Sequence, residues 1–247
     1  MKLFSVFAML VLFCSSPAFA EPYYRFWRGG KLAGLDAVRF EADLNRIFIP
    51  ATVNQGKGKG LLAYQPVLPP IEKPDFIPDE FALVTYQSEN GYRALKKMPV
   101  GAVYQKLHWS YFDRSRSKSL VPEEYRGEVA LEKAYDLLKG NTDWQKGASF
   151  FSLFLRASAE SNLQFVARIN SYILNSKQQF VAGGLNSWVI LVADGYAAEY
   201  QLWKTSAARE VALKACAFIP RKLQHMELEK REVPLKYGMG RNLIFSP

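Results

Sequence analysis

The predicted strands of this chain are apolar on both faces, and this feature constrains the fold more than any other. Phenylalanine and leucine occupy both sets of alternating positions in residues 148–156, and tyrosine, tryptophan and phenylalanine do so in residues 23–28. A half-exposed strand instead carries polar side chains on one face. Helices can cover one apolar face, but the second would stay exposed, which soluble monomers rarely tolerate. The sequence therefore predicts two sheets that pack against each other.

The first half of the chain predicts the order strand, helix, strand, strand, helix, strand. Aromatic and β-branched runs indicate the strands, and apolar residues at helical spacing indicate the helices. We expect Pro50 to end the first helix and Pro99 to end the second, because proline interrupts a helix. This order is typical of a ferredoxin-like split βαβ unit, an antiparallel sheet with two helices on one face. The expected strands are residues 23–28, 61–68, 81–86 and 102–112, and the expected helices are 34–50 and 92–98.

The second half repeats this order. A strand at 148–156, a helix around 163–173, strands at 188–193 and 199–203, and a helix at 206–218 precede an irregular last strand at 233–245. Between the halves, Pro122 followed by two glutamates is typical of a helix start, which predicts a linker helix. The expected organisation is a signal peptide in residues 1–20, a first ferredoxin-like half in 21–118, a linker helix in 119–142 and a second ferredoxin-like half in 143–247.

This element order, combined with strands that are apolar on both faces, resembles the dimeric α+β barrel superfamily. Both copies stand in one polypeptide here, so the resemblance implies an α+β fold in which two ferredoxin-like halves pack sheet to sheet as a barrel-like pseudo-dimer. It covers residues 23–112 and the chain from residue 148 onward. Members of the superfamily include cofactor-free monooxygenases, haem-dependent enzymes and small proteins that look like binding scaffolds. The resemblance therefore implies a fold and leaves the activity open.

The first twenty residues predict export. A lysine at position 2, an apolar run too short to span a bilayer and an Ala-x-Ala sequence ending at Ala20 are typical of a secretory signal peptide. We expect the mature protein in the periplasm, with no transmembrane segment. A lipoprotein signal at Cys14 is the alternative, which the bulky Phe13 disfavours. Cleavage would leave Cys216 as the only thiol, which excludes an intramolecular disulfide, and the apolar residues around it predict a buried position on a helix.

The mature chain is basic. Without Lys2, the 32 basic residues become 31 against 23 acidic residues, a net charge of +8. A surplus of this size attracts anionic partners, but export excludes nucleic acid as the expected one. Two basic stretches, residues 55–60 and 114–118, are expected to be solvated loops. A basic protein that contacts an anionic envelope surface is one alternative, and its binding would weaken as salt rises.

Candidate functional residues are few, and no catalytic motif of high specificity occurs. His108 lies in the predicted strand 102–112 among aromatic residues, where it is either a hydrogen-bonded sheet histidine or a pocket residue. Asp113, at the end of that strand, is the carboxylate best placed for acid–base chemistry, although it also fits an ordinary turn. No cluster of His, Cys and carboxylate has metal-ligand spacing, so no metal is expected. A pocket in the first half is expected near a subset of Tyr23, Trp27, His108, Tyr111 and Arg114.

These observations favour an exported protein that binds a small apolar or aromatic ligand, or an envelope protein, without a cofactor. The first alternative is an oxygenase-type enzyme on the same scaffold, either cofactor-free or haem-dependent with His108 as the axial ligand. The second alternative is the basic envelope-interaction protein. The sequence does not decide between enzyme and binding protein, and it leaves the oligomeric state open.

Overall fold

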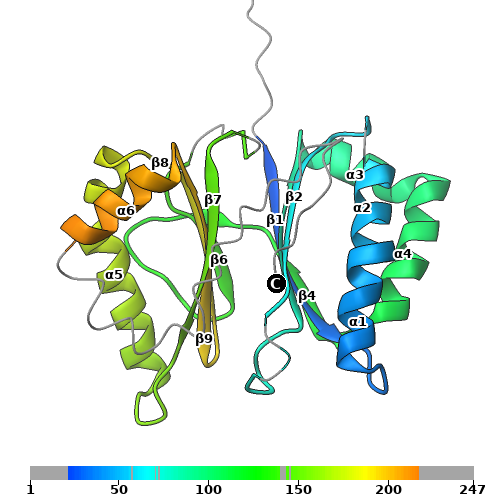
Figure 1. The fold of residues 1–247 in the computed structure, drawn as a ribbon, viewed down its shortest axis with the longest axis horizontal. Coiled ribbons are helices and arrows are strands. Elements are labelled where there is room, and N and C mark those ends of the chain that lie inside the picture. The colour runs from blue at the N-terminus through cyan, green and yellow to red at the C-terminus, as the bar shows by residue number, and fades with distance from the viewer. Residues whose placement is uncertain are drawn as a thin grey trace, which may run out of the picture.

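The computed structural model contains two β-sheets that stand back to back, with helices on the outer face of each (Figure 1). The layers therefore run helix, sheet, sheet, helix. The structure describes residues 22–216, apart from 57, 70, 72, 140–142 and 145. The predicted signal peptide and the strand expected at 233–245 lie outside these described residues.

The first half is a ferredoxin-like unit. Its four strands form an antiparallel sheet in the order β2-β3-β1-β4, with the helices on the outer face. This is the strand order that a split βαβ unit requires. The elements are β1 (Tyr23–Lys31), α1 (Ala37–Asp43), the π-helical turn η1 (Leu44–Phe48), α2 (Ile49–Gly56), β2 (Leu61–Val67), β3 (Glu80–Tyr86), α3 (Glu89–Lys97), α4 (Pro99–Tyr111) and β4 (Phe112–Leu120).

The second half has a sheet with the order β5-β6-β8-β9-β7. Within it, β8-β9-β7 corresponds to β2-β3-β1 of the first half, and β5 and β6 extend the opposite edge. No helix among the described residues is long and apolar enough to cross a membrane. The elements are β5 (Glu123–Glu124), β6 (Lys133–Asp136), β7 (Ala148–Leu155), α5 (Asn162–Ala182), β8 (Leu185–Ala193), β9 (Tyr196–Trp203) and α6 (Ser206–Ala215).

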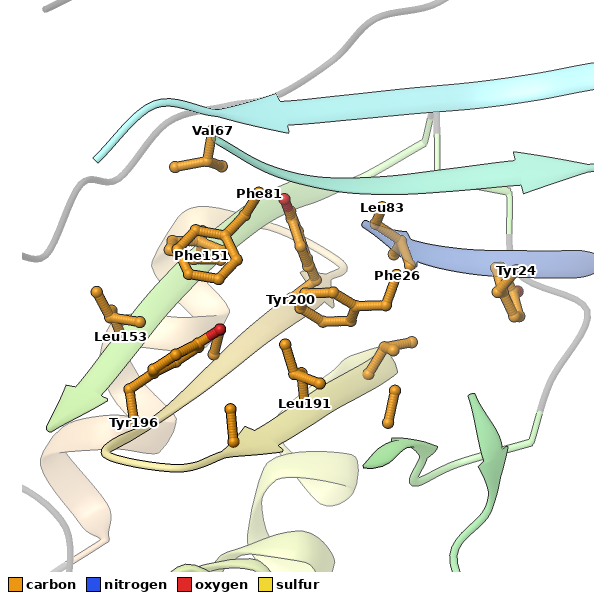
Figure 2. Packing of buried hydrophobic residues seen from close by; sticks show 14 of the residues in the cluster. Tyr24, Phe26, Val67, Phe81, Leu83, Phe151, Leu153, Leu191, Tyr196 and Tyr200 are labelled. Atoms are coloured by element: carbon orange, nitrogen blue, oxygen red, sulfur yellow. The ribbon is translucent and has the colours of Figure 1, made fainter. Parts of the chain in front are cut away.

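The interface between the two sheets confirms the expectation that the strands bury both faces. Phe81 of β3 packs against Phe151 of β7, with ring centroids 5.2 Å apart. Phe26 of β1 meets Tyr200 of β9 at 5.3 Å, and Figure 2 shows these side chains interleaved. The Tyr200 hydroxyl also donates a hydrogen bond of 2.9 Å to the carbonyl oxygen of Gln65. One apolar cluster therefore contains residues of both halves.

Two prolines were expected to end helices, and neither does so. Pro50 follows the π-helical turn η1 and lies inside a helical run that continues without a break from α1 to the end of α2 at Gly56. Pro99 is the first residue of α4. Proline has no N–H, and the first N–H groups of a helix have no partner within it, so proline is well tolerated at the start of α4.

The strand predicted at residues 102–112 is wrong, because these residues belong to α4 apart from Phe112, which begins β4. In a strand, Tyr104 and His108 would lie on one face and Tyr111 on the other, but the three residues are also four and three positions apart. That spacing places them on one face of a helix. The basic run that follows forms β4 and is not a loop, and β4 pairs antiparallel with β1.

The linker helix predicted within residues 119–142 is also wrong. Residues 123–124 and 133–136 form β5 and β6, and β6 pairs antiparallel with β8. Gly127 and Glu132 have φ angles of 103° and 61°, which a right-handed helix cannot accommodate. Ala134 and Tyr135 are buried on the sheet instead. Burial of these two side chains by the second half outweighs the helix-start signals around Pro122.

Candidate functional site

A cavity of about 320 Å³ lies in the first half, between the outer face of the sheet and helices α2, α3 and α4. This volume is at the lower end of the range for small-molecule sites. Its wall is mainly aromatic, with a few polar side chains. The aromatic residues that line it are Trp27, Phe48, Tyr64, Tyr86, Tyr92, Tyr104 and Trp109.

A glutamate is buried in the wall of this cavity. Glu80, the first residue of β3, has no solvent exposure. One carboxyl oxygen accepts a hydrogen bond of 2.8 Å from the Tyr64 hydroxyl, and the other accepts one of 2.8 Å from the Trp27 indole N–H. Burial raises the pKa of Glu80 to about 7, although both hydrogen bonds act in the opposite direction. Near neutral pH this carboxyl can therefore either give or accept a proton.

A histidine from α4 faces the same cavity. The ring of His108 lies 4.5 Å from Trp27 and 4.7 Å from Trp109, measured between centroids. Its Nδ1 atom is buried and has no hydrogen-bond partner among the residues that the structure describes. Burial lowers the pKa of His108 to about 4, so the imidazole is neutral at physiological pH. A residue of the cavity wall therefore carries a buried imidazole nitrogen with an unused hydrogen-bonding position.

The tyrosines of the cavity are held in fixed positions. The hydroxyl groups of Tyr104 and Thr52 lie within 3.0 Å of each other, and the Thr52 hydroxyl donates to the carbonyl oxygen of Phe48. The Tyr104 ring stacks on Phe48 at 5.6 Å. Burial raises the pKa values of Tyr64 and Tyr104, so both phenols stay neutral. These contacts give the cavity rigid aromatic walls.

The structure brings together two of the five ligand-binding residues expected from the sequence. Trp27 and His108 line the cavity. The other three contact lining residues from behind: Tyr23 lies 5.5 Å from the Tyr92 ring, Tyr111 lies 6.1 Å from Phe48, and Arg114 lies 4.9 Å from the Trp109 ring.

Asp113, the carboxylate singled out in the sequence, does not line the cavity. It accepts hydrogen bonds from the backbone N–H and hydroxyl of Ser115, and these lower its pKa. The turn expected there is wrong, because Asp113 belongs to β4 and pairs with Gly30 of β1. The carboxylate that does line the cavity is Glu80, which the sequence analysis did not identify as a candidate. An acidic residue directly before an apolar strand is the only signal it leaves, and the same pattern is typical of a solvated turn.

The second half repeats one part of this arrangement. Glu199 of β9 is buried, and it accepts hydrogen bonds from the Tyr172 hydroxyl at 3.0 Å and from the Trp188 indole N–H at 2.6 Å. Trp188 is packed against Tyr172 and Phe180, with ring centroids 5.4 and 5.5 Å apart. Each half thus places a glutamate between a tyrosine and a tryptophan. Around Glu199 these rings fill the space, whereas around Glu80 they line the cavity.

The haem alternative does not fit this site. Five aromatic rings surround His108 within 5.8 Å, measured between centroids. Histidines that hold a metal are usually oriented by a hydrogen bond to the second ring nitrogen, but no described residue makes such a bond to the buried Nδ1 of His108. Within the described part of the chain, no group of three or more His, Cys, Asp or Glu residues could hold a metal ion.

Comparison with known proteins gives similarity at the level of the fold. No family model and no curated protein sequence matches this chain. Among solved structures, a candidate monooxygenase from Fusobacterium nucleatum is 11% identical, with 86% of this chain and 90% of that chain covered and a TM-score of 0.44. A second one, from Lactobacillus acidophilus, is 7% identical, with 85% and 90% covered and a TM-score of 0.40.

SnoaB, a cofactor-independent oxygenase from Streptomyces nogalater, matches less of this chain. It is 9% identical, covers 43% of this chain and 96% of its own, and has a TM-score of 0.33. The arrangement of this chain, two sheets packed face to face with helices outside them, matches the tandem dimeric α+β barrel expected from the sequence. At these identities the likeness concerns the fold alone.

Proposed function

We propose that this protein binds a small aromatic ligand in the cavity of its first half. The observation that carries the proposal is the buried Nδ1 of His108, a residue that lines a cavity with aromatic walls, because this atom has no hydrogen-bond partner among the described residues. A buried polar atom without a partner costs about 1–3 kcal/mol. A ligand that hydrogen-bonds to this nitrogen removes that cost, while its ring packs between Trp27 and Trp109.

The polar groups of the cavity favour a ligand with a hydroxyl group. Neutral His108 offers one acceptor or donor position, and Glu80 can accept a proton or donate one near pH 7. Tyrosine and tryptophan rings supply stacking and edge-to-face contacts for an aromatic ring. A phenol satisfies both requirements, because it combines an aromatic ring with a hydroxyl group that can donate and accept.

Tryptophan fluorescence tests this proposal directly, since Trp27 and Trp109 line the cavity. We expect 2-naphthol to quench the fluorescence with a saturable, one-site curve. His108→Phe keeps an aromatic ring but removes the nitrogens, and we expect it to weaken binding about tenfold. Val103→Ala is a matched control, because Val103 lies on the same helix and is 70% exposed. Absence of saturable quenching by 2-naphthol and related phenols would contradict the proposal.

We propose proton abstraction from the bound phenol as a second candidate function, because Glu80 has a pKa of about 7 inside the cavity. A base with this pKa is well matched to operation near neutral pH. Removal of the phenolic proton is a first step that an oxygenase-type reaction without a cofactor could use. The test is oxygen consumption with 1,4-dihydroxynaphthalene above the uncatalysed rate. The excess rate should disappear in Glu80→Gln, and a rate unchanged by this substitution excludes the second candidate.

We further propose that the protein acts outside the cytoplasm, as the signal-like residues 1–20 suggest. Cell fractionation followed by sequencing of the mature N-terminus tests this, with Glu21 as the expected first residue. A role as a basic envelope-binding protein has less support, because part of the basic charge of β4 is paired. Arg116 lies 4.0 Å from Asp79, and Lys118 lies 3.3 Å from Glu132.

A further inference from the structure

The cavity has a second polar region at the end away from Glu80, formed around Arg25. Arg25 of β1 lines the cavity and is held in place by three hydrogen bonds. Its Nε donates to the Ser119 hydroxyl at 2.9 Å, and its two terminal nitrogens donate to the Tyr23 hydroxyl at 3.1 Å and to the Ser119 carbonyl oxygen at 3.4 Å. A guanidinium has five N–H donors. Two donors therefore remain for another partner.

A second cation contacts the same aromatic ring as Arg25. Arg25 and Lys96 lie 5.1 and 5.5 Å from the centroid of the Tyr92 ring. Both cations line the cavity. Among the residues that the structure describes, neither forms an ion pair with a carboxylate. Two unpaired cations that line one cavity both attract an anion bound there.

The strand register gives the spacing between this cationic region and Glu80. In the β1–β3 ladder, Arg25 pairs with Val84 and Gly29 pairs with Glu80. Arg25 and Glu80 are thus separated by four positions along the ladder, which corresponds to about 13 Å between backbone positions. Trp27 lies on β1 between the two regions. Both residues line the cavity, so the space between them suits a rigid ligand of two fused rings.

We propose that the ligand of this cavity is an aromatic hydroxy acid, with a carboxylate at one end and a hydroxyl group at the other. The carboxylate binds Arg25 and Lys96, the rings pack along Trp27, and the hydroxyl group reaches His108 and Glu80. This inference rests on the proposed function and names the chemical class of its ligand. A carboxylate matches the two free N–H donors of a guanidinium better than a neutral group does, because planar donors bind it in a fixed geometry.

The test compares 6-hydroxy-2-naphthoic acid with its methyl ester at pH 7.5, by quenching of tryptophan fluorescence. The two compounds have the same rings and hydroxyl group, but only the acid is charged. We expect the acid to bind about tenfold more tightly than the ester. Arg25→Gln and Lys96→Met should each weaken binding of the acid about tenfold and change binding of the ester less than twofold. Lys97→Met is the matched control, because Lys97 is an exposed neighbour on α3 that does not line the cavity.

The outcomes separate this inference from the proposed function. Equal affinity for the acid and the ester refutes the inference that a ligand carboxylate binds Arg25 and Lys96, and it leaves the proposed binding of phenols unaffected. No saturable binding of the acid, the ester or 2-naphthol overturns both. Arg25 is partly buried, so thermal unfolding of Arg25→Gln is measured in parallel. If that variant is unstable, Lys96→Met decides the test, because Lys96 is exposed and its replacement leaves the core unchanged.

Discussion

The two titratable side chains of the cavity should act on stability in opposite directions as pH changes. Burial raises the pKa of Glu80 from 4.5 to about 7, so the folded protein favours its protonated form. This stabilisation is present below pH 4.5 and is lost as the pH rises to about 7. Burial lowers the pKa of His108 from 6.5 to about 4, so the folded protein favours its neutral form. That stabilisation is present above pH 6.5 and is lost as the pH falls to about 4.

The two effects are similar in size. One pKa unit corresponds to about 1.36 kcal/mol, so each group changes the free energy of unfolding by about 3 kcal/mol across its own pH range. Between pH 4.5 and 6.5 the two contributions nearly cancel in the wild-type protein. When one of the two side chains is replaced, the pH dependence that the other contributes to the free energy of unfolding becomes measurable. Relative to the wild type, Glu80→Gln should gain about 3 kcal/mol between pH 4.5 and 7, and His108→Phe should lose about 3 kcal/mol between pH 4 and 6.5.

Urea unfolding followed by tryptophan fluorescence, at pH values from 4 to 8, measures these changes. A change of about 3 kcal/mol moves the midpoint by roughly 1 M urea or more. Each variant is compared with the wild type at the same pH, which removes the contributions of groups outside the cavity such as Glu132 and Glu160. The double variant should show neither change. If the difference between each single variant and the wild type does not vary with pH, the burial argument for both groups is refuted.

Three further predictions concern the fold. Phe81→Ala should lower the free energy of unfolding by about 3–5 kcal/mol, because Phe81 is fully buried against Phe151 between the sheets; a cost below about 1 kcal/mol in urea unfolding would contradict sheet-to-sheet packing. Gly147→Ala should cost about 1–3 kcal/mol in the same assay, because Gly147 has a φ of 100° and an added Cβ meets the Trp203 carbonyl oxygen. Ser161→Ala should cost about 1 kcal/mol by thermal unfolding, since Ser161 forms the capping box of α5; an unchanged midpoint argues against this cap.

Sequence periodicity was sufficient to assign a segment as strand or helix where the segment fits only one of the two periods. Runs such as 81–86 and 148–155 carry apolar residues at both sets of alternating positions, contain no helix signal and form β3 and β7. Residues 102–111 fit both patterns, because their aromatic residues alternate and are also spaced three and four apart. The strand interpretation was wrong there, since the choice depends on what the residues pack against. The aromatic side chains of α4 pack on the outer face of the sheet, and only a helix presents them together.

The candidate site could be predicted only in part. Trp27 and His108 were expected in a pocket because both stand among aromatic residues, and both line the cavity. Glu80 was missed because nothing in its local sequence distinguishes a buried carboxyl from a solvated one. Its burial depends on Tyr64 and Trp27, which come from two other strands. Arg25 was missed for the same reason, since Ser119 and Tyr92, which hold it, lie far away in sequence.

Apolar residues on both faces of the strands determined by themselves that two helix-covered sheets would meet through their second faces, because water would otherwise contact the side chains that no helix covers. Element order then determined the ferredoxin-like connectivity of the first half. Only the tertiary structure decided where the cavity lies and which polar groups face it. A side chain's neighbours across a sheet, and the water that they exclude, set its pKa and its free hydrogen-bonding positions, and no local pattern in the chain records those distant neighbours.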